Sequence, residues 1–157
     1  MSGKNIEIER KYLVKSDAWK ENSQGVLYRQ GYLSIEPERT VRVRLEGEAG
    51  KITIKSKKQN GSGDEFEYDI PGDDAAYLID HLCLKPIIEK LRYKISFRGN
   101  IWEIDEFLGE NLGLILAEIE LDSPEQKFEK PDWIGKDVTE DPKYKNASLV
   151  KNPYNGW

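Results

Sequence analysis

The chain has 157 residues, of which 38% are hydrophobic and 34% charged, and its net charge is −5. This length predicts one domain over residues 1–157, and the aliphatic and aromatic content excludes general disorder. The negative charge argues against nucleic acid as a partner, and the lack of a signal-peptide pattern or a long apolar run argues against a membrane and favours the cytoplasm.

The single cysteine, Cys83, and the single histidine, His81, limit the available chemistry. Cys83 cannot form an internal disulfide, and one histidine cannot supply a site with several histidine ligands. Any reaction must therefore be carried out by carboxylate, lysine, arginine and tyrosine side chains.

Alternating apolar and charged residues predict strands along most of the chain. In chain order these strands cover residues 5–14, 26–35, 40–46, 51–57, 65–70, 88–97, 101–107 and 114–121. Helices are predicted at residues 16–19, from 73 or 74 to 84, and at about 124–130. A hairpin turn at 48–50, a loop at 58–64 and an irregular C-terminal tail complete the pattern.

The charged faces of these strands are sorted by sign. Glu7 and Glu9 make the first strand acidic, and Arg42 and Arg44 make the third one basic. The strands at 51–57 and 88–97 are also basic, and those at 65–70, 101–107 and 114–121 are acidic. A single strand of this kind is typical of a solvent-exposed face, but the sorting of the whole set indicates a binding site. If the strands close into a barrel of about eight, the charges point inward, where a phosphate ligand with divalent metals can bind both signs.

The first strand contains the motif Glu7-Ile8-Glu9-Arg10-Lys11, and the blocks RVRL, TIKSK, EFEYDI, EKLRYK, WEIDEF and AEIEL follow it in order. This series resembles the triphosphate tunnel metalloenzymes, also called the CYTH superfamily, of the small bacterial inorganic triphosphatase type. The resemblance implies a mainly β (α+β) fold, an eight-stranded antiparallel β-barrel tunnel with a charged interior and helices packed outside. It also implies Mg²⁺ or Mn²⁺ as the cofactor, and a C-terminal helix across one mouth.

The resemblance further implies roles for individual residues. The implied metal ligands are Glu7, Glu9, Asp105, Glu118 and Glu120. The implied triphosphate-binding cations are Lys11, Arg42, Arg44, Lys55, Lys90 and Arg92. The implied supporting carboxylates are Glu65, Glu67 and Glu103. Lys11, Tyr32 and Lys90 are the predicted catalytic residues, and Lys90 would position the attacking water or assist the leaving group.

The predicted reaction is cleavage of inorganic triphosphate to diphosphate and phosphate. Lys11 and Tyr32, the latter in a Gln-Gly-Tyr-Leu block, would hold a bare triphosphate and leave less room for an organic extension. A nucleoside or thiamine triphosphatase, a class IV adenylate cyclase and a non-catalytic polyphosphate- or nucleotide-binding module stay open as alternatives. The small-molecule triphosphate is the predicted partner, and the oligomeric state is open, with a homodimer as one option.

Overall fold

The computed structural model describes residues 5–21 and 23–157 of the chain. Its main feature is a set of eight strands whose bounds agree with the predicted ones to within a few residues. They are β1 (Ile6–Val14), β2 (Val26–Glu36), β3 (Arg39–Glu46), β4 (Ala49–Lys55), β5 (Ser62–Ile70), β6 (Ile88–Phe97), β7 (Asn100–Phe107) and β8 (Ile115–Glu120).

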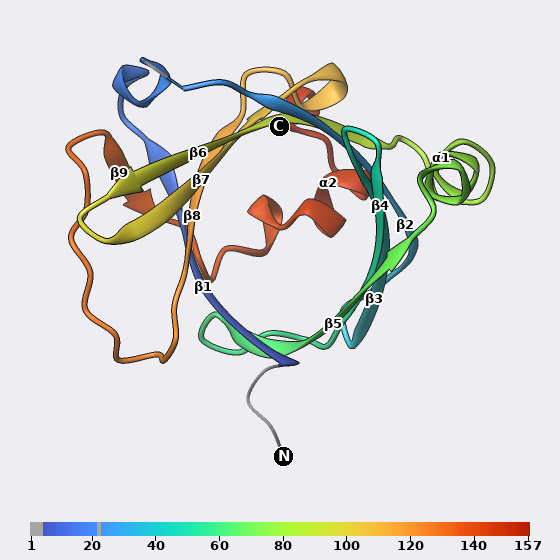
Figure 1. Ribbon diagram of the computed structural model, residues 1–157, viewed down its shortest axis with the longest axis horizontal. Helices are drawn as coiled ribbons and strands as arrows, with labels where there is room; N and C mark the ends of the chain where they lie inside the picture. The colour runs from blue at the N-terminus through green and yellow to red at the C-terminus, as the bar shows by residue number, and fades with distance from the viewer. Residues whose placement is uncertain (1–4, 22) are drawn as a thin grey trace.

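The eight strands form a closed ring (Figure 1). Neighbours follow the order β5-β4-β3-β2-β6-β7-β8-β1, and β1 pairs with β5 to close the circle. Every neighbouring pair is antiparallel. The predicted eight-stranded antiparallel tunnel is therefore confirmed, and closure satisfies the backbone groups that an open sheet would leave at its edges.

Strand β1 is the seam of the ring because it has three partner strands. Residues 9–13 pair with β8, residues 6–8 pair with β5, and Tyr12 and Val14 pair with β9 (Ile134–Asp137). The sequence did not predict β9, because its four residues, Ile-Gly-Lys-Asp, show no alternation of apolar and polar side chains. Its backbone pairing with β1 is what makes it a strand.

Apolar side chains cover the outside of the ring in two clusters, while charged side chains line most of the inside. The larger outer cluster lies on β1, β6, β7 and β8 and contains Tyr12, Trp19, Tyr93, Trp102, Ile104, Ala117, Ile119, Leu121 and Ile134. The other lies under helix α1 (Gly72–His81) and contains Val43, Ala75, Ile79 and Cys83. The predicted charged interior is confirmed, and Cys83 is buried.

Helix α1 lies outside the ring against β3 and β4 (Figure 1). It ends at His81 rather than at residue 84, because the chain turns back there and the Leu84 N–H donates to the Tyr32 carbonyl at 2.9 Å. The N-cap residue is Pro71, so Asp73 and Asp74 lie within the first turn instead of capping it. Their negative charges still suit the positive end of the helix dipole.

The helix predicted at about 124–130 is wrong. Residues 124 and 125 form a turn and residues 126–130 have no regular secondary structure, and Phe128 packs against the larger outer cluster. Phe128 packs edge-on against Trp102, with the ring centroids 5.9 Å apart, and an Arg10 guanidinium donates to the Pro124 carbonyl at 3.1 Å. These long-range contacts outweigh the local helix propensity.

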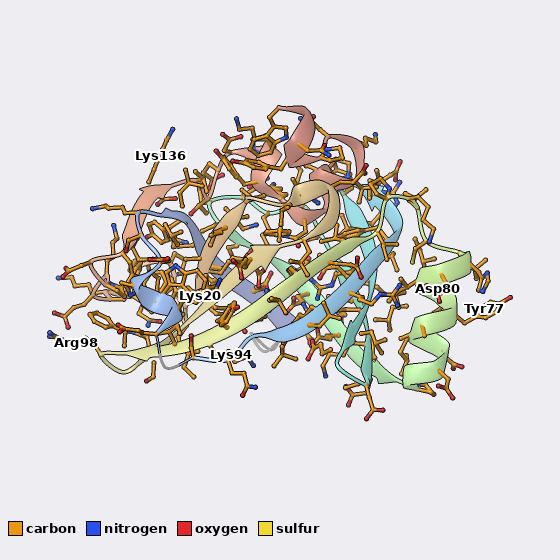
Figure 2. All side chains as sticks on the ribbon, turned by 90° about the horizontal axis from the view of Figure 1, so that it is seen from above. Lys20, Tyr77, Asp80, Lys94, Arg98 and Lys136 are labelled. Carbon is orange, nitrogen blue, oxygen red and sulfur yellow. The ribbon has the colours of Figure 1, made fainter. Side chains whose placement is uncertain are left out.

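The C-terminal tail lies across one opening of the ring (Figures 1 and 2). Short helical turns are η2 (Ala18–Lys20), η3 (Gly109–Asn111), η4 (Pro142–Tyr144) and η5 (Tyr154–Gly156), and the tail also contains α2 (Asn146–Lys151). In α2, Leu149 and Val150 are buried in an apolar cluster with Tyr32 and Phe107 inside the ring. The tail helix that the resemblance implied is present, so α1 packs outside whereas α2 closes a mouth. Within the described residues, every helix is too short or too polar to cross a membrane.

Candidate active site

The interior of the ring encloses a cavity of about 760 Å³ that side chains of both charges line. The carboxylates are those of Glu7, Glu9, Glu65, Glu67, Glu103, Glu118, Glu120 and Glu140. The cations are those of Lys11, Arg42, Arg44, Lys55, Lys57, Lys58, Lys90, Arg92, Lys145 and Lys151. The ring thus brings all the predicted site residues to one cavity, with the exception that Asp105 is buried in its wall.

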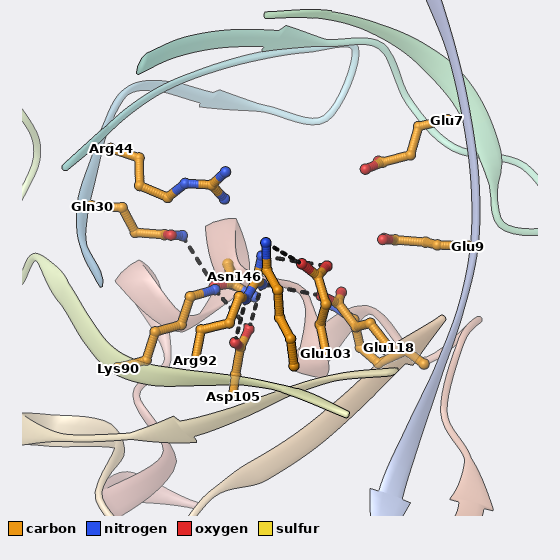
Figure 3. A network of polar contacts seen from close by, with 12 residues as sticks. Glu7, Glu9, Gln30, Arg44, Lys90, Arg92, Glu103, Asp105, Glu118 and Asn146 are labelled. Carbon is orange, nitrogen blue, oxygen red and sulfur yellow. Dashed lines mark hydrogen bonds and ion pairs between the residues drawn. The ribbon is translucent and has the colours of Figure 1, made fainter. Parts of the chain in front are cut away.

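Asp105 on β7 holds two cations of β6 in place. Its two oxygens accept from Arg92 Nε and Nη2, each at 2.8 Å, and one of them also lies 2.8 Å from Lys90 Nζ (Figure 3). Burial alone would raise the pKa of Asp105, but the charges of Arg92 and Lys90 and their hydrogen bonds hold it well below the usual range. Because both oxygens are engaged, Asp105 is better placed to orient these cations than to bind a metal.

Lys90 is buried, and it is the cation of the site whose charge is least secure. Its Nζ donates to Asn146 Oδ1 at 2.9 Å, so the tail helix α2 contacts it directly. Burial, together with the neighbouring charges of Arg92 and Arg44, lowers the pKa of Lys90 to about 7 despite the opposing charge of Asp105. A lysine with this pKa can accept or donate a proton near neutral pH.

Arg42 and Arg44 of β3 line the cavity with Lys90 and Arg92 of β6, and we call these four side chains the cationic wall of the cavity. Arg44 on β3 and Arg92 on β6 both contact the Tyr28 ring, each guanidinium carbon 5.0 Å from the ring centroid. Arg42 Nη2 donates to Thr53 Oγ1 at 3.1 Å, whereas its buried Nε has no hydrogen-bond partner among the described residues. An unpaired buried donor on a cation is a place for an anionic ligand.

Glu7 and Glu9 project from β1 into the opposite side of the cavity (Figure 3). Lys58 Nζ donates to both carboxylates, at 2.6 Å to Glu9, and Lys55 Nζ donates to Glu7 at 3.0 Å. Burial opposes ionisation, but the charges of Lys55 and Lys58 lower the pKa of Glu7 to about 2. The two carboxylates are therefore ionised and already hold a cation.

The neighbouring carboxyls carry more negative charge than these lysines neutralise. Burial, the charge of Glu7 and a hydrogen bond with Glu7 raise the pKa of Glu65 to about 7. Burial and the charges of Glu7, Glu103 and Glu9 also raise the pKa of Glu120, which lies opposite Glu9 on β8. A carboxyl group with a raised pKa holds a proton more readily, and this proton takes the place of a cation that could otherwise balance the charge of Glu65 or Glu120.

Glu118 and Glu103 lie between the two sides and pair with cations. Glu118 is 3.5 Å from Lys11 Nζ and 3.4 Å from Arg92 Nη2, and Glu103 is 3.5 Å from Arg92 Nη1. Lys11 also donates to the Tyr144 carbonyl at 3.2 Å, so it is tied to the tail. Tyr32 lines the same cavity, but the hydrogen bond of Lys11 goes to Tyr144 rather than to Tyr32.

Several site residues escaped the sequence interpretation. Lys58 lies out of phase with the inward-facing Thr53 and Lys55 of β4, and the stretch containing it was predicted as a loop. The Asn60-Gly61 pair after it is a strong hairpin signal that could have revealed a tight turn there. Asn146, which accepts from Gln30 at 3.0 Å and from Lys90, had no signal in the sequence because only the folded tail brings it into the ring.

The donor chemistry of the acidic side suits a divalent cation. Carboxylate oxygens are the ligands that Mg²⁺ and Mn²⁺ prefer, and Glu7, Glu9, Glu65 and Glu120 supply them from three adjoining strands. In residues 5–21 and 23–157, no three such groups already surround one point. Lysine ammonium groups and a proton neutralise these carboxylates instead, so a metal ion fits the charge and the donor set of this side.

Comparison with known proteins gives a consistent result. The model of the CYTH domain family matches residues 5–154. An inorganic triphosphatase of Acetivibrio thermocellus is 53% identical over 94% of this chain and 95% of its own length, and one of Nitrosomonas europaea is 35% identical over 92% and 96%. A crystal structure of an inorganic triphosphatase, 34% identical, superposes with a TM-score of 0.65 and covers 91% of this chain and 96% of that one.

Proposed function

Because the chain belongs to the CYTH domain family, we propose that it is a divalent-metal-dependent hydrolase that cleaves inorganic triphosphate to diphosphate and phosphate. The observation that carries this proposal is the cavity with a cationic wall on one side and surplus carboxylates on the other. A highly charged anion that binds together with a divalent cation satisfies both sides. The names of the two relatives support triphosphate as that anion.

The cationic wall binds the phosphate oxygens. Arg42, Arg44 and Arg92 come from neighbouring parts of the ring, and Asp105 and Tyr28 hold the last two guanidinium groups in place before substrate enters. Donors that are fixed in advance stabilise the charge of the transferring phosphoryl group without reorganisation. Lys11 and Lys55 add positive charge toward the acidic side.

The acidic side holds the cofactor. Glu7, Glu9 and Glu120 are the proposed metal ligands. Glu65, which forms a hydrogen bond with Glu7, and Glu118, two residues before Glu120 on β8, line the same cavity and are proposed to support them. A bound Mg²⁺ or Mn²⁺ ion supplies Lewis-acid polarisation of the phosphoryl oxygens.

Lys90 is the proposed acid–base group. Water adds to the terminal phosphorus, the bond from that phosphorus to the bridging oxygen breaks, and diphosphate leaves with the electron pair. The proton of the attacking water passes to the neutral Nζ of Lys90, whose pKa of about 7 makes it able to accept one. The adjacent carboxylate of Asp105 then stabilises the resulting ammonium at 2.8 Å.

The tail favours the bare triphosphate over substrates with an organic group. Pro142, Lys145, Asn146 and Ala147 line the cavity at the mouth that α2 crosses, so a nucleoside or thiamine at this end would have to fit against the tail. The nucleoside part of a nucleotide would have to extend out of the other end of the ring. This arrangement ranks ATP and thiamine triphosphate below triphosphate as substrates.

Phosphate release from triphosphate, ATP and thiamine triphosphate, each measured with Mg²⁺, with Mn²⁺ and with a chelator, tests the proposal. We expect triphosphate to react fastest and the chelator to abolish the reaction. The Glu9→Gln variant should lose activity, while Glu129→Gln, which changes an exposed carboxylate paired with Arg98, should retain it. Equal or faster release from ATP would refute the substrate assignment, and release that survives the chelator would refute metal dependence.

A further inference from the structure

Lys58 occupies the position between Glu7 and Glu9 that a metal ion would otherwise take. Its Nζ donates to Glu7 Oε1 and, at 2.6 Å, to Glu9 Oε1. The side chain is 15% exposed, so the contact lies within the cavity wall rather than on the surface. One ammonium group thus binds two proposed metal ligands at once.

The turn that presents Lys58 is tightly fixed. Gln59 and Ser62 exchange backbone hydrogen bonds of 2.9 and 3.0 Å around Asn60 and Gly61, whose φ angles are +53° and +78°. Positive φ at both central residues is typical of a type I′ hairpin. A Cβ atom on Gly61 would lie 2.4 Å from the Glu9 carbonyl, and the Glu9 N–H donates to the Gly61 carbonyl at 2.9 Å. The hairpin is therefore anchored to the strand whose carboxylate Lys58 binds.

Gly63 provides the space for the Lys58 side chain. It lies opposite Glu7 in the pairing of β1 with β5, and a Cβ atom there would come within 3.0 Å of Lys58 Cγ. A larger residue would press on the aliphatic stem that crosses at this point. The hairpin and Gly63 together direct the ammonium group to Glu7 and Glu9.

An ammonium group and a divalent cation cannot share the same carboxylate oxygens, because their charges repel at that distance. A metal ion that binds Oε1 of Glu7 and Oε1 of Glu9 therefore displaces Lys58, whose long side chain then needs a new anionic partner. Other cations already line the cavity, among them Lys55, Lys57 and Lys145, so leaving without such a partner would be unfavourable. A triphosphate in the same cavity provides that partner.

We propose that Lys58 is an exchanging cation, which neutralises Glu7 and Glu9 in the metal-free protein and moves to the triphosphate when a divalent ion takes its place. This inference rests on the proposed function and adds a coupling between its two ligands. Without triphosphate, Lys58 competes with the metal. With triphosphate bound, Lys58 assists both ligands, so each ligand strengthens the binding of the other.

Calorimetry on the Lys58→Met variant tests the competition. We expect Mn²⁺, in the absence of any phosphate, to bind the variant about tenfold more tightly than the wild type, because its competitor is gone. The metal-free variant should also melt at a lower temperature than the wild type, and added Mn²⁺ should remove this difference. Lys136→Met, which removes a solvent-exposed ammonium group (Figure 2), is the matched control and should change neither quantity.

The exchange itself is tested with a non-hydrolysable imido analogue of triphosphate, titrated with and without saturating Mn²⁺. The factor by which Mn²⁺ tightens analogue binding should fall about tenfold in Lys58→Met, and Lys58→Arg should retain part of it. Lys58→Gln serves as a second uncharged variant in case Lys58→Met does not fold. If Mn²⁺ tightens analogue binding by the same factor in Lys58→Met as in the wild type, the exchange is refuted, and Lys58 does no more than repel the metal ion. These measurements involve no turnover, so they can refute the exchange while the wild type still releases phosphate. If the binding results are as expected but the wild type releases no phosphate, only the proposed function is refuted.

Discussion

The two sides of the cavity reach electrical balance in different ways. On the side we call the cation frame, Lys90 and Arg92 share the carboxylate of Asp105, and three of their contacts measure 2.8 Å. On the side we call the carboxylate end, Glu7 and Glu9 share the ammonium of Lys58. Figure 3 shows the members of the frame joined by hydrogen bonds, and Glu7 and Glu9 across the cavity from them.

The difference lies in how each balance is held. Arg92 and Asp105 are direct register partners on β6 and β7, so the backbone ladder itself fixes their pairing. Lys58 comes from a hairpin outside the alternation of its strand, and burial together with the charge of Glu7 raises the pKa of Glu65, next to Glu7, to about 7. The frame is thus built to stay in place, while the carboxylate end is built to accept another cation.

Removal of the central carboxylate should break the cation frame and produce the largest effect. Asp105→Asn removes the carboxylate that pairs with Lys90 and leaves Arg92 with its longer contacts to Glu103 and Glu118. We therefore expect a loss of about 3–5 kcal/mol in the free energy of unfolding. Urea denaturation measures it. Asp80→Asn, which opens an exposed pair with Arg29, should cost no more than about 1 kcal/mol. Equal losses in the two variants would contradict the frame.

Lys90→Met should leave the fold largely intact but remove the proton acceptor. We expect kcat to fall about 100-fold, because general acid–base catalysis typically contributes at least that much. In the wild type, Lys90 must be neutral to act, so kcat/KM should rise as the pH increases through about 7, the pKa of this group. The pH–rate profile of the variant should lack this rising limb, and a limb that persists would assign it to another residue.

The ring could be predicted from the sequence because its alternation is written in each strand separately. Val43 faces the α1 cluster while Arg42 and Arg44 face the cavity. The same two-residue period determines which side chains of the remaining strands of the ring point inward. The sign of the charges along each strand then predicted which faces meet. Closure into an eight-stranded tunnel followed from the family resemblance, whereas the pairing of β1 with β5 that closes it was not predicted.

The missed features depend on contacts between distant parts of the chain. β9 exists because β1 offers it an edge beyond Tyr12, and the segment 124–130 is not helical because Phe128 packs on Trp102. Asn146 reaches Lys90 only because Leu149 is buried inside the ring. No local periodicity reports such contacts, which explains why Lys90 was predicted as a site residue without its contact from the tail, and Asp105 as a metal ligand rather than as the partner of Lys90 and Arg92.

A negative charge placed on the tail beside Lys90 should raise the pKa of Lys90 and so test its proposed acid–base role. Asn146→Asp puts a carboxylate beside Lys90 Nζ, where the amide oxygen now accepts at 2.9 Å, and so favours the protonated lysine. We expect the rising limb of the pH–rate profile to move to higher pH and kcat/KM at neutral pH to fall about tenfold. Asn152→Asp, on the exposed end of α2, should not move the limb.

Glu65→Gln should have the smallest effect and act on the carboxylate end alone. The folded protein raises the pKa of Glu65 from 4.5 to about 7, so it binds this proton more tightly than the unfolded chain does. The resulting stabilisation is complete below pH 4.5 and is lost as the pH rises through about 7. With a chelator present, urea denaturation measures the free energy of unfolding at a pH below this window and at one above it. The decrease from the lower to the higher pH should be about 1 kcal/mol larger in the wild type than in Glu65→Gln. Bound Mn²⁺ should reduce the difference, because a metal cation removes the need for the proton, whereas a pH dependence unaffected by Mn²⁺ would mean that the carboxylate end does not bind it.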